Sequence, residues 1–233
     1  MEKNLLNRAV GFFWKMFQLN LLFAVGNIVL IAVTLSVVFR WITLPLFLLG
    51  IILLAPSLQA LFLTIRRLDE SEETSLVKLY IRCYREEFKG AVFFALGYIS
   101  GSFLLFGAYL GLRFMPNQTP FIPVYALIAI ILYVHFIFGL LIRAKFDIGI
   151  KSTWRLGLYC ISKYPLYALF IFGGTLIAGA LINTFHQLIL LGFIPMLIYL
   201  LTVSTEKMFS DITEVLNIPN NKEGNTNESE DDR

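Results

Sequence analysis

The polar residues that could do chemistry are few, and three of them interrupt a long apolar run. Pro56 is followed there by Ser57 and Gln59. Proline removes one helical hydrogen bond and kinks a helix, so the carbonyl that it frees needs another donor. A kink at this point makes Ser57 and Gln59 candidate pocket-lining residues, together with Asn20 and Asn27 from the preceding apolar run. The alternative, which we favour, is that these side chains form hydrogen bonds between helices.

His135 is the only strongly titratable side chain inside an apolar run, and it is a further pocket-lining candidate. Proton-coupled carriers usually show buried carboxylates, or Lys or Arg facing a cavity. The apolar runs contain none of these residues. We therefore expect His135 to form a hydrogen bond in the helix packing rather than to contact a substrate.

Two cysteines, Cys83 and Cys160, belong to charged connections between the apolar runs. These connections are predicted to be cytoplasmic, where thiols stay reduced, so we expect no disulfide. Neither cysteine has a His or acid cluster near it in sequence, as a zinc site requires. The chain also lacks a nucleophile–base pair, a phosphate-binding glycine loop and an H-E-x-x-H motif. We expect no enzymatic activity, no cofactor and no metal.

Small residues recur at a spacing of four in two of the apolar runs. Such spacing lets helix backbones approach closely inside a membrane. Packing within one chain is the favoured interpretation, and a homo-oligomer through these faces is the alternative. The predicted helix-packing residues are Gly97, Gly101, Gly107, Gly111, Gly174 and Ala178.

The elements that position these residues follow from composition. Charged residues are 15% and hydrophobic residues 58% of the 233 residues, whereas a soluble domain has about 25% charged residues. A transmembrane helix needs roughly 20 apolar residues. We predict an all-α, polytopic transmembrane helix bundle with six spans, each free of Asp, Glu, Lys and Arg: 19–39, 41–65, 90–112, 121–142, 164–182 and 188–204.

The distribution of basic residues predicts the orientation of these spans. Alternate sides of the six-span arrangement receive 17 and 2 of the 19 Lys and Arg residues, and the positive side is normally cytoplasmic. Both termini should therefore lie inside. A net charge of +3 placed in this way gives no indication of nucleic-acid binding. Candidate cytoplasmic basic residues for binding anionic lipid or a partner are Arg66, Arg67, Arg82, Arg85, Arg143 and Lys145.

Segments that flank the spans are amphipathic or polar. Residues 1–18 are predicted to form an interfacial helix, and 71–89 a cytoplasmic amphipathic helix that leads into the third span. Residues 151–163 resemble 71–89, with Trp154, Leu158 and Tyr159 as interfacial candidates. The chain from 205 to 233 is predicted to be a cytoplasmic tail, disordered from about 217.

An offset of 77 residues relates two parts of the chain. Arg66 aligns with Arg143, Cys83 with Cys160, and Gly97 with Gly174. We predict that spans two and three are repeated as spans four and five in parallel orientation.

Three segments resemble the YesL-like family of bacterial membrane proteins, a domain of unknown function. They are Asn20-Leu-Leu-Phe, "APSLQALFLTIRRL" at 55–68 and "LYIRCYREEFKGA" at 79–91. Ser57 and Phe23 are mild departures from the family pattern. The resemblance implies a multi-pass protein of the bacterial plasma membrane, often associated with carbohydrate utilisation, without an established catalytic or ligand-binding residue.

From this resemblance we expect a transport-associated component linked to carbohydrate uptake, either an accessory or a small carrier. Its expected partners are the lipid bilayer and membrane transporter subunits. The alternative is a structural or regulatory membrane scaffold that binds a cytoplasmic partner or anionic lipid.

Overall fold

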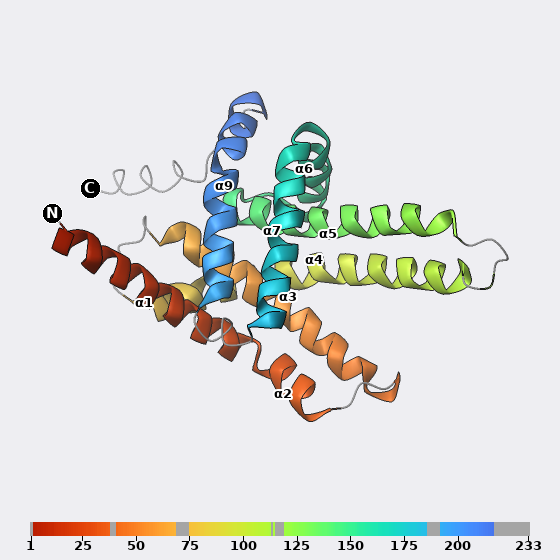
Figure 1. Ribbon diagram of the computed structural model, residues 1–233, viewed down its shortest axis with the longest axis horizontal. Coiled ribbons are helices and arrows are strands. Elements are labelled where there is room, and N and C mark those ends of the chain that lie inside the picture. Colours follow the sequence, from red (N-terminus) through yellow and green to blue (C-terminus); the bar gives the residue numbers. More distant parts are fainter. Residues whose placement is uncertain are drawn as a thin grey trace, which may run out of the picture.

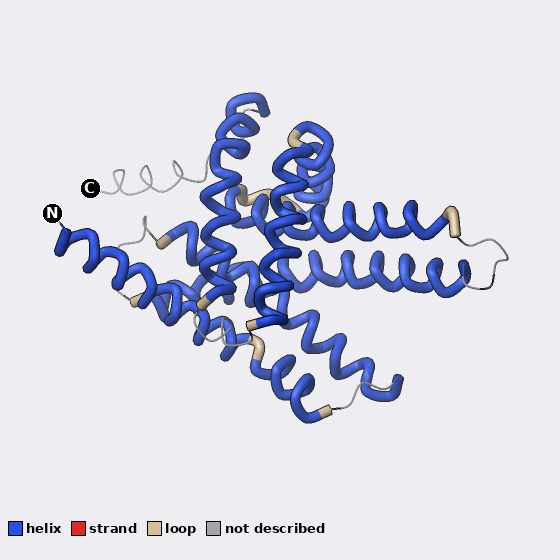
Figure 2. Tube along the Cα trace, viewed as in Figure 1, coloured by secondary structure: helices blue, strands red, loops and turns tan. Residues whose placement is uncertain are grey.

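The computed structural model of the protein describes residues 2–37, 41–68, 75–112, 114, 119–185 and 192–216. Over these residues every regular element is a helix (Figures 1 and 2). The predicted disordered tail from about 217 lies outside the described residues. The all-helical class predicted from the sequence is therefore confirmed for the described part of the chain.

The N-terminal helix is longer than the sequence windows suggested. Helix α1 runs without interruption through Glu2–Gly26, and the shorter α2 follows at Ile28–Ser36. At the break, the Asn27 side-chain amide donates to the carbonyl of Phe23 at 2.8 Å. The window 19–39 is thus divided between two helices, and its first part is continuous with the predicted interfacial segment.

Two long helices follow. A 3-10 turn at Trp41–Thr43 leads into α3, Leu44–Arg67, which continues through Pro56. Helix α4, Leu76–Leu112, has 37 residues, or about 55 Å at ~1.5 Å per residue. It joins the predicted cytoplasmic amphipathic helix and the third span into one element. Helix α5, Phe121–Lys145, runs back beside α4, and the outer part of this hairpin projects away from the other helices (Figure 1).

The C-terminal third has a different arrangement. Amphipathic α6, Ile150–Lys163, is followed by α7, Pro165–Thr184, after a bend of 99°. Helix α9, Phe193–Leu216, includes the first part of the predicted tail. Helices α7 and α9 run across the α4–α5 hairpin rather than along it (Figure 1).

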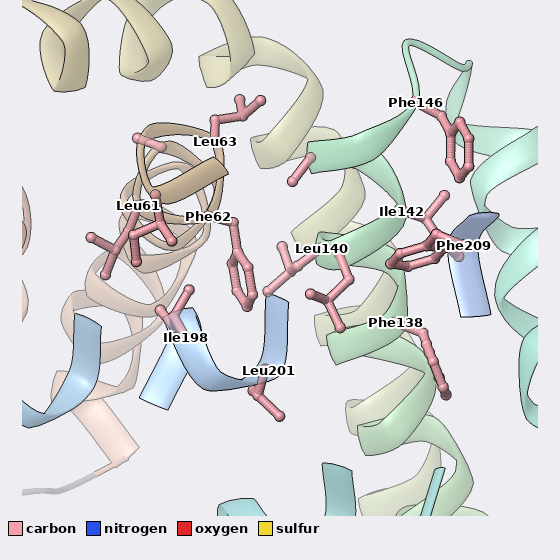
Figure 3. Packing of buried hydrophobic residues seen from close by; sticks show 14 of the residues in the cluster. Leu61, Phe62, Leu63, Phe138, Leu140, Ile142, Phe146, Ile198, Leu201 and Phe209 are labelled. Carbon is pink, nitrogen blue, oxygen red and sulfur yellow. The ribbon is translucent and has the colours of Figure 1, made fainter. Parts of the chain in front are cut away.

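The core lies where α3, α5 and α9 meet. Leu61, Phe62 and Leu63 of α3 are buried with residues of α5 and α9 (Figure 3). The ring of Phe209 on α9 packs edge-on against Phe146, just beyond α5. The helix ends that carry the basic residues are therefore held by close packing.

Much of the remaining helix surface is apolar and exposed. Leu104 and Leu166 are 77% and 78% exposed, as expected for side chains that face lipid. Among the described residues, four helices are long and apolar enough to cross a membrane: Asn7–Gly26, Pro45–Arg67, Leu76–Leu112 and Phe121–Lys145. A fifth is added if the bent α6–α7 pair forms one span. The chain is therefore consistent with a membrane protein of several spans.

Helix boundaries follow the 77-residue offset. Shifted by 77, α3 falls on residues 121–144, which is α5 except for its last residue. Shifted likewise, α4 falls on 153–189, over most of α6 and α7. Cys83 and Cys160, paired by the offset, are both fully buried. These correspondences support the predicted repeat.

Candidate functional site

A cavity of about 480 Å³ lies between α3, α4 and α5, within the range of roughly 300–1,000 Å³ that is typical of ligand sites. Its lining is mostly aliphatic and aromatic. The lining residues that have a polar side-chain atom are Tyr98, Ser102, Tyr125 and Tyr133. The cavity therefore offers an apolar ligand a good fit and a polar ligand few partners.

The five residues predicted to line a pocket do not line this cavity. Ser57 and Gln59 are fully buried, and His135, Asn27 and Asn20 are 2%, 4% and 6% exposed. They are divided among α1, α3 and α5 and the break at Asn27. All five are buried in the interior of the helix bundle.

Ser57 lies at a close contact between three helices. A Cβ atom at Gly26 would overlap Oγ of Ser57 and lie 3.2 Å from the hydroxyl of Tyr80. That hydroxyl donates to the Ser57 carbonyl at 3.4 Å. Oγ of Ser57 and Oδ1 of Asn27 are buried without a hydrogen-bond partner among the described residues. Gly26 therefore brings the end of α1 against α3 directly after Pro56.

Gln59 is the least satisfied polar side chain of the group. Both its Nε2 and its Oε1 are buried without a partner in the described part of the chain. Such a group usually costs about 1–3 kcal/mol relative to an apolar replacement. The preferred interpretation from sequence, hydrogen bonding between helices, thus has no observed bond to support it at Gln59.

His135 has two partners. The hydroxyl of Tyr98 bonds to Nδ1 of His135, and Nε2 lies 2.9 Å from the carbonyl of Trp154. A carbonyl only accepts hydrogen bonds, so Nε2 carries the proton and Nδ1 accepts from Tyr98. The rings of Tyr98 and Trp154 stack at 4.6 Å. His135 thus joins α4, α5 and α6, which is the packing role expected from the sequence.

Four of the predicted cytoplasmic basic residues form ion pairs. Arg67 of α3 pairs with Glu86 at 2.8 Å, and Arg143 of α5 pairs with Glu87. Both glutamates belong to α4. Each pair therefore fastens the end of one helix to the first half of α4.

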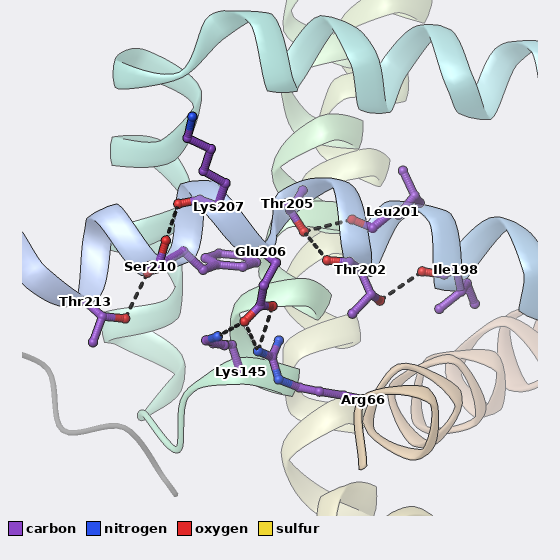
Figure 4. A network of polar contacts seen from close by, with 11 residues as sticks. Arg66, Lys145, Ile198, Leu201, Thr202, Thr205, Glu206, Lys207, Ser210 and Thr213 are labelled. Atoms are coloured by element: carbon purple, nitrogen blue, oxygen red, sulfur yellow. Dashed lines mark hydrogen bonds and ion pairs between the residues drawn. The ribbon is translucent and has the colours of Figure 1, made fainter. Parts of the chain in front are cut away.

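Glu206 of α9 pairs with two cations at once. Arg66 lies 3.0 Å from its Oε2, and Lys145 contacts its Oε1 (Figure 4). Partial burial alone raises the pKa of Glu206, but Lys145 and Arg66 outweigh this effect and lower it. The carboxylate thus ties α9 to the ends of α3 and α5. The other two predicted basic residues, Arg82 and Arg85, are exposed on α4.

Most of the glycines that lie at close helix contacts are not the ones predicted from the four-residue spacing. Gly97 does pack closely, since a Cβ there would lie 3.1 Å from the ring of Trp154. Gly101 is in ordinary contact range of Leu132, and Ala178 is buried. A Cβ atom at Gly107, Gly111 or Gly174 would have no atom of another element within 4 Å among the described residues.

Besides Gly26, further glycines outside the predicted set make tight contacts, among them Gly139, Gly157 and Gly90. A Cβ at Gly139 would overlap the ring of Phe94, and one at Gly157 would lie 2.7 Å from Nε2 of His135. A Cβ at Gly90 would overlap the guanidinium of Arg143. Glu86, Glu87 and Glu206 were also not predicted as partners. The adjacent acids in "REEFKG" are the signal that could have identified the first two.

The described residues offer little else that could carry out a reaction. Within the ranges that the structure covers, no three His, Cys, Asp or Glu side chains gather as a metal site requires. The thiols of Cys83 and Cys160 are enclosed in the packing. The arrangement is suited to holding helices together, and the partly open cavity between α3, α4 and α5 is suited to contact with an apolar group.

The chain is similar to one protein family. Residues 16–109 match the model of a family described as "Protein of unknown function, DUF624". This range runs from α1 to most of α4 and contains the segments 55–68 and 79–91 quoted above. No curated protein and no solved structure matches the chain. The match supports a family of unknown function for this part of the chain, while the YesL-like name stays a resemblance.

Proposed function

We propose that the protein is an accessory component of a transport system in the bacterial plasma membrane, linked to carbohydrate uptake. It acts through contacts with transporter subunits, without enzymatic activity and without carrying the solute itself. The link to transport rests on the resemblance of residues 20–91 to the YesL-like family. The choice of accessory over carrier rests on where the polar side chains lie.

The supporting observation is that the residues suited to a solute path are closed off. Ser57 and Gln59 are fully buried, and His135 is held by Tyr98 and Trp154. A sugar needs many hydrogen bonds, because each buried hydroxyl without a partner costs about 1–3 kcal/mol. The cavity between α3, α4 and α5 has few polar atoms, and one of them, the Tyr98 hydroxyl, is already bonded.

Purification from the native membrane tests this proposal. The chain, tagged at its C-terminus, is extracted in mild detergent, and proteins that co-elute are identified and quantified by mass spectrometry. We expect transporter subunits in stoichiometric amount. Recovery of this chain alone, together with sugar uptake by vesicles that contain only this chain, would replace the accessory role with a carrier.

Substitution of Gln59 by Leu provides a second test. An accessory that carries no solute should keep its solute-dependent growth phenotype when this buried amide is removed. A carrier that uses Gln59 as a ligand should lose growth on that solute. The variant's level in the membrane is measured alongside, so that a loss of protein is not mistaken for a loss of transport.

For the topology we propose six spans with both termini in the cytoplasm. Helix α7 lacks charged residues and exposes Leu166 and Ile177, which supports six spans. Its direction across the α4–α5 hairpin supports the four-span alternative (Figure 1). A four-span arrangement, with α7 and α9 along the cytoplasmic side, gives the same 17 to 2 division of basic residues, since the connection 183–187 has none. The two arrangements differ in the side on which Asn183 lies.

Single cysteines in a chain with Cys83→Ser and Cys160→Ser substitutions distinguish these topologies. A membrane-impermeant maleimide is applied to intact cells. Thr119→Cys should react and Ser152→Cys should not in either arrangement, so they serve as controls. Asn183→Cys should react if the chain crosses six times. Protection of Asn183→Cys in intact cells, with labelling after lysis, would support four spans instead.

A second candidate function is the membrane scaffold that binds anionic lipid or a cytoplasmic partner. It is favoured by cations that remain exposed on α4 and α6, among them Arg85 and Arg155. Co-purification separates the two functions, since a scaffold of this kind should recover no transporter subunit.

A further inference from the structure

Helix α6 carries basic residues that the ion pairs of the bundle do not use. Its sequence, IKSTWRLGLYCISK, contains three cations and no acidic residue. Lys151, Arg155 and Lys163 are all exposed, and none forms an ion pair with a described residue. Asp211 of α9 acts on Lys163 electrostatically without pairing with it. By contrast, Arg66, Arg67, Arg143 and Lys145 are each matched by a glutamate.

The exposed face of α6 is also partly apolar. Lys151, Arg155, Leu158 and Ser162 follow one another at helical spacing, and all four are exposed. Leu158, at the middle of this stripe, is 53% exposed. A leucine between cations suits the boundary between lipid headgroups and acyl chains better than it suits water.

Aromatic side chains flank the stripe. The Lys163 ammonium lies 5.3 Å from the ring centre of Tyr159 and 5.7 Å from that of Tyr164. Trp154 is half-buried, with its ring against Tyr98 and Gly97. Tyrosine and tryptophan are enriched at the level of the headgroups.

The orientation of α6 agrees with this location. It begins five residues after α5 ends, and α7 leaves it at 99°. If α7 crosses the bilayer, α6 lies along its surface. The basic end of α5, with Arg143 and Lys145, assigns that surface to the cytoplasmic side. This step rests on the proposed six-span topology, because α7 crosses the bilayer only in that arrangement.

We propose that the exposed stripe of α6 with Lys151, Arg155 and Leu158, together with Lys163 at the C-terminal end of the helix, binds the anionic headgroups of membrane phospholipids. The cations contact the headgroup phosphates, and Leu158 inserts among the upper parts of the acyl chains. The predicted basic residues at the ends of α3 and α5 hold the bundle together, whereas those of α6 contact the lipid. An acidic protein partner would need no leucine at the centre of the cationic stripe.

Trp154 provides a probe of the lipid next to α6. The chain has three tryptophans, so Trp14→Phe and Trp41→Phe leave Trp154 as the only indole. This protein is reconstituted in phosphatidylcholine vesicles that contain a small, fixed fraction of either spin-labelled phosphatidylglycerol or spin-labelled phosphatidylcholine. Both leaflets have the same composition, so the result does not depend on the protein's orientation or on its topology in the cell.

We expect stronger quenching of Trp154 by the anionic than by the zwitterionic label, and a loss of this difference at high salt. Each single substitution should reduce the affinity for the anionic label, relative to the zwitterionic label, about fivefold. The three substitutions are Lys151→Gln, Arg155→Gln and Lys163→Gln. The triple variant should show equal quenching by both labels.

The matched control removes the same number of positive charges from another helix. Lys78→Gln, Arg85→Gln and Lys89→Gln remove three exposed cations from the first half of α4, and this variant should keep the preference for the anionic label. Circular dichroism and gel filtration show whether each variant is folded. Equal quenching by both labels in the unsubstituted chain, or a preference that survives in the α6 triple variant, would overturn the proposal.

Discussion

The contact between Gly139 and Phe94 allows a prediction in which structure and sequence pattern disagree. A Cβ at Gly139 would overlap Cζ of Phe94 and lie 3.0 and 3.1 Å from its two Cε atoms. Carbon atoms in contact normally lie about 3.5–4.0 Å apart. Phe94 is fully buried and its ring packs against Tyr98, Phe136 and Trp154. The Gly139→Ala substitution therefore requires the ring to move where its neighbours leave little room.

The magnitude follows from two opposing effects. Overpacking of a core costs about 1–3 kcal/mol, and the enclosed position of Phe94 places Gly139→Ala near 3 kcal/mol. Alanine recovers about 1 kcal/mol of helix propensity relative to glycine. The net loss in the free energy of unfolding is about 2 kcal/mol, or a decrease in Tm of about 4–8 °C for a chain of this size.

Thermal unfolding in detergent with a thiol-reactive fluorescent dye measures the effect, because Cys83 and Cys160 are both fully buried and become reactive on unfolding. The control is Gly107→Ala, since Gly107 has no neighbour within 4 Å among the described residues. It should leave Tm unchanged or raise it slightly. If the glycines at four-residue spacing marked the packing face, Gly107→Ala would lower Tm more than Gly139→Ala does. Equal Tm values for the two variants would also refute the reasoning.

Three further predictions concern polar side chains. Gln59→Leu should raise the free energy of unfolding by about 1–3 kcal/mol, because it removes two unpaired buried atoms, and a lower Tm would show that Gln59 has a partner. Tyr98→Phe should cost about 1–3 kcal/mol by leaving Nδ1 of His135 unpaired, and in a His135→Phe background the same change should cost much less in a double-mutant cycle. Because the pKa of Glu206 is lowered, its ion pairs contribute fully above its ordinary value of 4.5 and are lost as pH falls below it. The stability difference between wild type and Glu206→Gln should therefore shrink in acid, and a difference constant from pH 7 to pH 3 would contradict this assignment.

Helix identity could be predicted from the sequence better than helix boundaries. Windows without charge located the apolar parts of α3, α4 and α5, because lipid excludes charged side chains. They did not indicate that Glu2–Gly26 and Leu76–Leu112 each form one continuous helix. A change from polar to apolar residues alters the environment but leaves the backbone free to continue. The actual break, at Asn27, coincides with a side chain that bonds to the carbonyl of Phe23. A local backbone contact of this kind has no hydropathy signal.

Which residues meet across helices was the least predictable feature. Four glycines define one face of α4: Gly97, Gly101, Gly107 and Gly111. Their spacing does not indicate which part of that face another helix contacts. Only the half near Trp154 has a close neighbour within the described residues. Gly139 and Gly157 are isolated glycines, and their role depends on the rings of Phe94 and His135 from other helices. Charge indicated that Arg143 and Glu87 lie at the same end of the bundle, but the sequence analysis did not predict that they pair.

The bend between α6 and α7 links the repeat to the proposed lipid contact. Under the 77-residue offset Pro165 corresponds to Phe88, where α4 continues straight. Proline disfavours a helical conformation in the residue before it, and Tyr164 has φ −123° and ψ 59°, outside the helical region. The first copy therefore extends its amphipathic half along the same axis as its apolar half, with Glu86 and Glu87 binding Arg67 and Arg143. The second copy has Lys163 and Tyr164 at the positions of those glutamates, and its amphipathic half turns through 99°. The proline and the two missing acids thus coincide with the two differences between the segments: the bend, and the absence from α6 of ion pairs with described residues.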